Sequence, residues 1–156
     1  MKFDVIVEKI VTGPFQENTF VVRSVESNQT LIIDPGDDEV RIIEFIRSKK
    51  LIPLAILNTH AHLDHIGAVS KLKESFNIPF YLHEKEKMIL DHYEESCEMF
   101  GLLPKQKPKV DKWLKNHKSL TIKDFKVKII NTPGHTPGGV CYEIDNHIFV
   151  GDTIFK

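Results

Sequence analysis

Residues 54–67, LAILNTHAHLDHIG, constrain the fold more than any other stretch, because a short apolar run leads directly into three histidines and an aspartate. The apolar residues 54–57 do not alternate with polar ones, which is typical of a strand covered on both faces. In an extended exit from that strand, His60 and His62 point the same way, because side-chain direction repeats every two residues. The sequence therefore predicts that two imidazoles share one metal ion.

Asp64 and His65 begin the next segment, in which apolar residues recur at near-helical spacing and predict a helix over residues 64–76. At the start of that helix their side chains face away from the histidine pair, where they are suited to hold a second metal ion. Imidazole nitrogens with a carboxylate favour zinc, and also iron or manganese, over calcium or magnesium. Chance is a poor explanation, since this composition is expected to produce the H-x-H-x-D-H spacing only about 0.001 times per chain.

The rest of the chain alternates between strand and helix patterns, which predicts an α/β class. Strands are expected over residues 3–11, 18–25, 30–33, 79–82, 125–131, 139–144 and 147–150, and helices over residues 37–50 and 84–100. The lysine-rich residues 104–118 are interpreted as a surface loop, with Trp113 at the edge of the core and not over a substrate. A length of 156 residues and 41% hydrophobic content allow one domain over residues 1–156.

Composition excludes several classes of partner and setting. A net charge of −1 provides no strong field for nucleic acid or an anionic membrane. The N-terminal residues have the pattern of a strand and not of a signal peptide or membrane span, and Cys97 and Cys141 have no disulfide or metal-type spacing. We therefore expect a cytoplasmic protein that acts on a small molecule.

The pattern formed by His60, His62, Asp64 and His65 resembles the signature of the metallo-β-lactamase superfamily. Three further motifs follow in the superfamily's order, namely Asp34-Pro35-Gly36, Thr132-Pro133-Gly134-His135-Thr136-Pro137-Gly138 and Gly151-Asp152-Thr153. The segment GPFQEN at residues 13–18 is similar to the glyoxalase II-like branch. The resemblance implies an αββα sandwich that is C-terminally incomplete, with further strands and helices missing after residue 156.

The resemblance also implies the ligand sets. A first metal would be held by His60, His62 and His135, and a second by Asp64 and His65, with Asp152 bridging both. Superfamily members add a late histidine to the second site, and this sequence has no counterpart of it. We therefore expect the first metal to bind more tightly than the second. The prolines and glycines around His135 enforce a rigid loop that suits a ligand. A carboxylate at Asp152, directly after a buried strand, would be costly unless it were paired or metal-bound.

Two interpretations are left open for Asp34, which either supports the ligand loop through hydrogen bonds or forms an ordinary turn before Pro35. The remaining histidines, His83, His92, His117 and His147, are expected to be surface or hydrogen-bonded core residues. The incomplete sandwich would leave part of a sheet uncovered, and either a partner chain in a homo-oligomer covers it or the chain is a fragment of a longer protein.

The expected chemistry is hydrolysis by a metal-bound hydroxide. A divalent metal lowers the pKa of bound water from ~15.7 to ~7, and Asp64 would orient the hydroxide and pass a proton to the leaving group. No G-x-S-x-G motif supports a serine mechanism. The branch implies a thioester or ester substrate of the acyl-glutathione type, such as S-lactoylglutathione.

Three alternatives remain beside this prediction. Two of them lie within the superfamily, namely lactone hydrolysis and persulfide dioxygenation at a single iron. The flavodiiron branch is disfavoured because it carries Glu where this chain has His62. Outside enzymes, the alternative is a catalytically inactive fragment that only binds metal.

Overall fold

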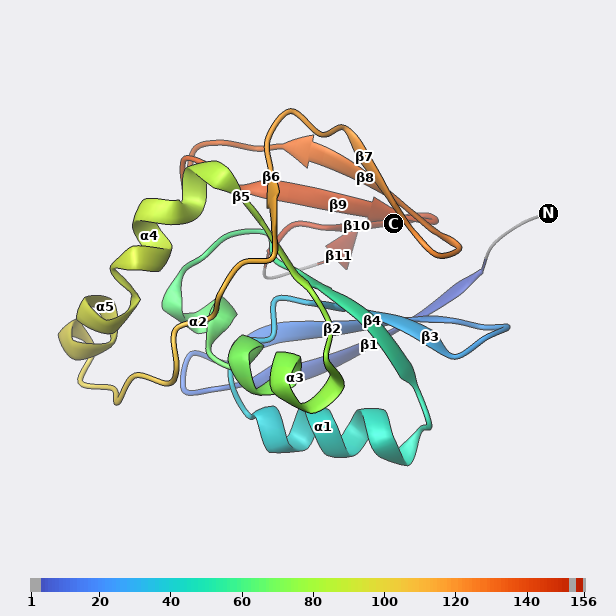
Figure 1. Ribbon diagram of the computed structural model, residues 1–156, viewed down its shortest axis with the longest axis horizontal. Helices are drawn as coiled ribbons and strands as arrows, with labels where there is room; N and C mark the ends of the chain where they lie inside the picture. The colour runs from blue at the N-terminus through green and yellow to red at the C-terminus, as the bar shows by residue number, and fades with distance from the viewer. Residues whose placement is uncertain (1–3, 152–153, 156) are drawn as a thin grey trace.

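The computed structural model describes residues 4–151 and 154–155, which form two β-sheets and a set of helices (Figure 1). The first sheet has the strand order β1-β2-β3-β4-β5-β6, antiparallel from β1 to β3 and parallel from β3 to β6. Its strands are β1 (Val5–Thr12), β2 (Glu17–Ser24), β3 (Gln29–Ile33), β4 (Ile52–Leu57), β5 (Phe80–His83) and β6 (Lys112–Leu114). The predicted α/β class is confirmed.

The second sheet is antiparallel throughout and has the order β11-β10-β9-β8-β7. Its strands are β7 (Ser119–Ile122), β8 (Phe125–Asn131), β9 (Val140–Ile144), β10 (His147–Phe149) and β11 (Ile154–Phe155). The long β8–β9 connection contains His135, so this sheet delivers one of the predicted metal ligands.

The helices α1 and α3 lie on the face of the first sheet that is turned away from the second sheet (Figure 1). The helical elements are α1 (Glu39–Ser48), α2 (Leu63–Ile66), α3 (Val69–Phe76), the 3-10 helix η1 (Glu84–Glu86), α4 (Lys87–Asp91) and α5 (Tyr93–Met99). None of the helices in the described ranges is long and apolar enough to cross a membrane.

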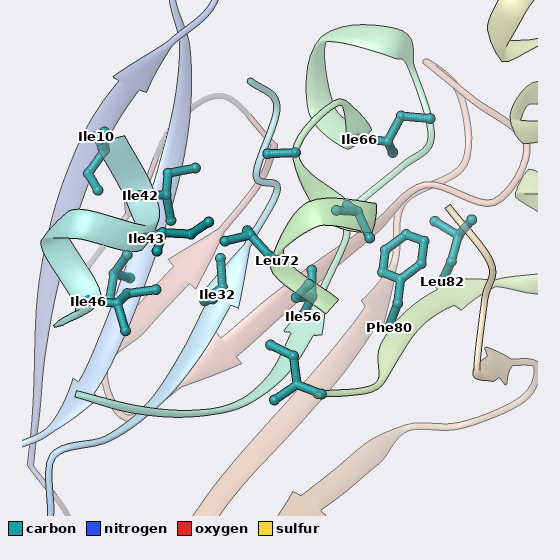
Figure 2. Packing of buried hydrophobic residues seen from close by; sticks show 14 of the residues in the cluster. Ile10, Ile32, Ile42, Ile43, Ile46, Ile56, Ile66, Leu72, Phe80 and Leu82 are labelled. Carbon is teal, nitrogen blue, oxygen red and sulfur yellow. The ribbon is translucent and has the colours of Figure 1, made fainter. Parts of the chain in front are cut away.

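The central strands of the first sheet are buried on both faces, which explains their uninterrupted apolar runs. In β3, Ile32 packs with the helices, whereas Leu31 and Ile33 pack between the sheets. Figure 2 shows the helix side, where Ile42 and Ile46 of α1 lie beside the sheet residues. The prediction of a doubly covered strand before the histidines is therefore confirmed in β4, which begins two residues earlier than expected.

The helix predicted over residues 64–76 is wrong in one respect, because it is interrupted between α2 and α3. The backbone of Pro35 and Gly36 lies against the break, and Ala68 N donates to Pro35 O at 3.1 Å. A Cβ atom on Gly67 would lie 2.2 Å from Gly36 O. The neighbouring turn thus replaces one intrahelical hydrogen bond and separates the ligand-bearing turn α2 from α3.

Two other predicted elements are also divided differently. The helix expected over residues 84–100 is split into η1, α4 and α5, with His92 between the last two. The loop expected over residues 104–118 contains β6, which pairs in parallel with β5, and the sequence reasoning missed β7. Trp113 packs against the helix-side core, as interpreted, because β6 extends the sheet there.

Candidate metal centre

The candidate centre lies where loops from both sheets meet, beyond the carboxyl ends of the parallel strands β3, β4 and β5 (Figure 1). His60 and His62 follow β4, and His135 lies in the β8–β9 loop. Val140 N donates to Thr59 O at 3.0 Å, so the end of the His135 loop is bonded directly to the start of the His60 loop. Residues separated by about half the chain are thereby brought to one place.

The first cluster brings together His60 and His62, the pair expected from the strand pattern, and His135, which the family resemblance added. Their ligand nitrogens all lie within 4.8 Å of one another. The ring centroids of His62 and His135 are 4.6 Å apart, with the ring planes at 86°. Three imidazoles whose nitrogens lie this close together match the donor set that zinc prefers in proteins.

Hydrogen bonds assign the tautomer of His60. The hydroxyl of Thr59 donates to Asp34 Oδ2 at 2.6 Å, so it accepts from His60 Nδ1, which lies 2.9 Å away. With the proton on Nδ1, the Nε2 atom of His60 carries a lone pair. This buried nitrogen has no hydrogen-bond partner among the described residues. A lone pair of this kind is what a metal ligand requires, so the residues fit a bound cation.

The second cluster contains Asp64 and His65, as predicted, and also Glu17, which was not predicted. His65 Nε2 lies 3.5 Å from Glu17 Oε2 and 3.7 Å from Asp64 Oδ2. Glu17 was missed because it begins a strand of the first sheet; the available signal was its place in the GPFQEN motif. The predicted bridging ligand Asp152 lies outside the described residues.

Asp34 connects the two clusters through hydrogen bonds to Thr59, next to His60, and to His65. Its fully buried carboxylate accepts hydrogen bonds from Thr59 N at 2.7 Å and from Thr59 Oγ1, and Oδ2 lies 3.2 Å from His65 Nδ1. The interpretation that Asp34 supports the ligand loop is confirmed. Asp34 has a φ of +52°, a conformation that aspartate tolerates better than most residues.

The histidines of the two clusters differ in charge. Burial, together with the charge of His65 and with other nearby imidazoles, lowers the pKa of His60 to about 4. Burial and the neighbouring His135 also lower the pKa of His62. Burial disfavours the charged form of His65 too, but the hydrogen bond and charge of Asp34, with the charges of Asp64 and Glu17, outweigh it and raise its pKa to about 9. His60 and His62 of the first cluster thus offer neutral nitrogen donors at neutral pH.

Of the four histidines assigned no role, three behave as expected. His83 is buried and bonded, since its Nδ1 accepts from Lys85 N at 3.1 Å and its Nε2 lies 3.0 Å from Lys115 O, while His92 and His117 are exposed. His147 differs, because its buried Nδ1 has no hydrogen-bond partner in the described part of the chain.

A groove of about 370 Å³ opens beside the centre, and both His62 and Asp64 line it. Its walls are otherwise largely apolar, and they include Phe15, Ala61, Leu63, Ile89, Tyr93, Met99 and Phe100. The rings of Phe15 and Phe100 meet edge to face with centroids 5.4 Å apart, so α5 and the β1–β2 loop are joined at the groove.

Known proteins are similar to this chain in sequence and in fold. The profile of the Metallo-beta-lactamase superfamily matches residues 12–156. Hydroxyacylglutathione hydrolase GloC of Haemophilus influenzae is 33% identical over 154 residues, which cover 96% of this chain and 72% of GloC.

Two solved structures have the same fold. The structure of BLEG-1 B3 metallo-beta-lactamase is 40% identical with a TM-score of 0.82, over 89% of this chain and 67% of that one. TTHA1623 in a di-iron-bound form is 33% identical with a TM-score of 0.80, over 96% and 73% of the two chains. The matched fold explains why loops from both sheets converge on His60, His62 and His135, and this chain is a metallo-hydrolase that belongs to the metallo-beta-lactamase superfamily.

Proposed function

We propose that this metallo-hydrolase cleaves a thioester or ester bond in an acyl-glutathione type of substrate. The observation that carries the proposal is the convergence of His60, His62 and His135 beside the carboxylate of Asp64, at the end of an apolar groove. The similarity to a hydroxyacylglutathione hydrolase supports the choice of a thioester. A divalent cation in this donor set would lower the pKa of a bound water from ~15.7 to about 7 and polarise the substrate carbonyl.

Asp64 is the residue that we propose to move protons. It lies in the first turn of α2 with 22% of its side chain exposed, and it faces the groove together with His62. A carboxylate in this position accepts a hydrogen bond from the attacking water and then passes the proton to the leaving thiolate. His60 has no role as a base, because the lone pair of its Nε2 atom is the one offered to the cation.

Zinc is the cation that we propose for the first cluster, because three imidazole ligands and an open position are typical of catalytic zinc. Iron and manganese are compatible with the same donors, and the di-iron form of TTHA1623 supports iron as an alternative. A second cation would be held by Asp64 and His65, and Glu17 lies close enough to contribute a third ligand.

The groove supports a substrate with an apolar acyl group. Phe15 and Phe100 form an aromatic wall of the groove that His62 and Asp64 also line, and the lining contains few charged side chains besides Asp64. We propose that the acyl carbons lie against this wall and place the thioester carbonyl beside His62. Apolar walls combined with a few directed polar groups are typical of small-molecule sites.

A second candidate function is hydrolysis of a β-lactam amide. The similarity to BLEG-1 B3 metallo-beta-lactamase favours it, since the sequence identity is 40%. Both reactions require attack on a carbonyl carbon, and they differ in the leaving group. A thiolate leaves without the full protonation that an amine requires, so the two substrates test Asp64 differently.

The proposal is tested by assaying an S-acyl-glutathione and a chromogenic β-lactam with the purified zinc-loaded chain. The substitution His62→Ala removes one imidazole from the first cluster and is expected to reduce thioester hydrolysis to the uncatalysed rate. His117→Ala is the matched control, because it removes an exposed imidazole that belongs to neither cluster. Thioester hydrolysis that survives His62→Ala would exclude the proposed site, and zinc binding without any hydrolysis would favour a non-catalytic metal-binding protein.

A further inference from the structure

Glu86 is a buried carboxylate that lies beside the centre but belongs to neither metal cluster. It is the last residue of η1, the short helix that follows β5, and its relative exposure is 0%. A carboxylate in such a place is costly unless its oxygens accept hydrogen bonds. The bonds that Glu86 accepts therefore indicate what the residue does.

Each oxygen of Glu86 accepts a backbone N–H from a different ligand loop. Its Oε1 accepts from Ala61 N at 2.9 Å, and its Oε2 accepts from Gly138 N at 2.7 Å. Ala61 stands directly between the two histidines of the loop that follows β4, and Gly138 lies three residues after His135. One carboxylate thus joins the two chain segments that carry the first cluster.

The contact is close on the backbone side as well. A Cβ atom on Gly138 would lie 3.0 Å from both Glu86 N and Lys85 Cβ, so the loop of His135 rests directly on η1. The turn itself is held by His83, whose Nδ1 accepts from Lys85 N at 3.1 Å. The turn that carries Glu86 is therefore also held by the last residue of β5.

We propose that Glu86 is a positioning residue that clamps the two ligand loops at a fixed separation, and thereby sets the affinity and coordination geometry of the cation. The clamp orders both loops when the chain folds, so less conformational freedom is lost when the cation binds. A carboxylate suits the task because it offers only acceptors to two N–H groups. The inference rests on the proposed metal site and is independent of the substrate.

The substitution Glu86→Gln tests the clamp, because glutamine has the same shape but places an NH₂ donor against one of the two N–H groups. Zinc affinity of the full metal-free chain is measured by competition with a chromophoric chelator. We expect the affinity to fall about 10- to 100-fold. In the cobalt-loaded chain, the visible absorption bands are expected to change in position and intensity, because the three imidazoles no longer meet at the same geometry.

Asp111→Asn is the matched control. Asp111 also accepts a backbone bond, from Phe80 N at 2.8 Å, and it pairs with Lys73, but it lies at the opposite end of β5 from Glu86. This substitution weakens the same strand without touching either ligand loop. We expect it to leave the zinc affinity and the cobalt spectrum unchanged.

Glu86→Asp provides a second variant if the glutamine variant does not fold. It keeps the charge but is one methylene shorter, so it cannot bond both amides without moving a loop. The clamp is refuted if a folded variant at Glu86 binds zinc and cobalt like the unsubstituted chain, or if Asp111→Asn lowers the affinity equally. Failure of the unsubstituted chain to bind either metal would instead refute the proposed metal site itself.

Discussion

The two halves of the candidate centre contain histidines that are buried to a similar degree but have opposite charge preferences. His60 is 7% exposed and His65 is 2% exposed, and their ring centroids are 4.1 Å apart. Yet burial lowers the pKa of His60 to about 4, whereas the carboxylates around His65 outweigh its burial and raise its pKa to about 9. Neighbouring charges, and not depth, decide whether a buried imidazole is a neutral ligand or a cation.

Because of this difference in histidine pKa, the two halves of the centre have different requirements for binding a cation. His60 and His62 have lowered pKa values, so they can accept a cation at neutral pH without losing a proton. His65, in contrast, has a raised pKa, and its positive charge is paired with the carboxylates of Asp34, Asp64 and Glu17. A second cation that binds to His65 has to displace this proton.

The largest effect is expected for Asp64→Asn, which should separate catalysis from binding of the first cation. Loss of the carboxylate removes the proposed proton acceptor, so thioester hydrolysis should fall by about 10²- to 10⁴-fold. Zinc affinity of the first cluster should change only slightly, because its three imidazoles are untouched. Asp91→Asn, at an exposed carboxylate paired with Lys87 on α4, is the control. A normal rate with Asp64→Asn would remove this residue from the chemistry.

The next effect concerns proton release on metal binding. Between pH 7 and 9 the affinity for the second cation should rise about tenfold per pH unit, because His65 must lose its proton first. The first cation should show almost no change over the same range. Calorimetric titration in two buffers of different ionisation enthalpy measures the protons released with each equivalent. Equal proton release in both steps would mean that the two halves are not distinct.

The smallest effect is expected in the stability of the metal-free chain. His65 has a raised pKa, so its contribution is complete below pH 6.5 and is lost as the pH rises through about 9. His60 has a lowered pKa, so its contribution is complete above pH 6.5 and is lost as the pH falls through about 4. The free energy of unfolding should therefore be highest near pH 6.5 and fall by on the order of 1–3 kcal/mol on either side.

Urea unfolding at a series of pH values measures this profile. The substitution Asp34→Asn tests the origin of its alkaline side. The substitution removes the nearest charge that holds the proton on His65, so the alkaline decline should become shallower. The variant is also expected to be less stable at every pH, because an amide has only one oxygen and can accept only one of the two hydrogen bonds that Thr59 donates to Asp34. A profile of unchanged shape would show that Asp34 does not control the charge of His65.

Local patterns were sufficient to predict most of the strands and both ligand loops, but not β6 and β7. The doubly buried strand β4 and the rigid loop of His135 carry their signals within a few residues, and His60 and His62 follow from the period of an extended chain. That both loops meet at one point was implied by the family resemblance and not by spacing, because the contact joins segments more than 70 residues apart.

The residues that were missed owe their roles to tertiary contacts. Glu86 lies in a stretch rich in Glu and Lys, which has the composition of a solvated helix, and only the approach of two loops buries it. Glu17 likewise reaches the centre through the hairpin of β1 and β2. The break between α2 and α3 depends on the turn at Pro35, which periodicity within residues 64–76 does not report.

The close approach of Gly36 and Gly67 limits how this protein can be engineered. Replacing a helical glycine by alanine commonly stabilises a protein by up to about 1 kcal/mol, so Gly67 is an obvious target for a thermostable variant. A methyl group at Gly67 would instead lie 2.2 Å from Gly36 O, and one at Gly36 would lie 2.0 Å from Asp64 O. Any atom added between Gly36 and Gly67 displaces the turn that presents Asp64 and His65. A substitution made here to raise thermal stability would therefore disturb the candidate metal centre.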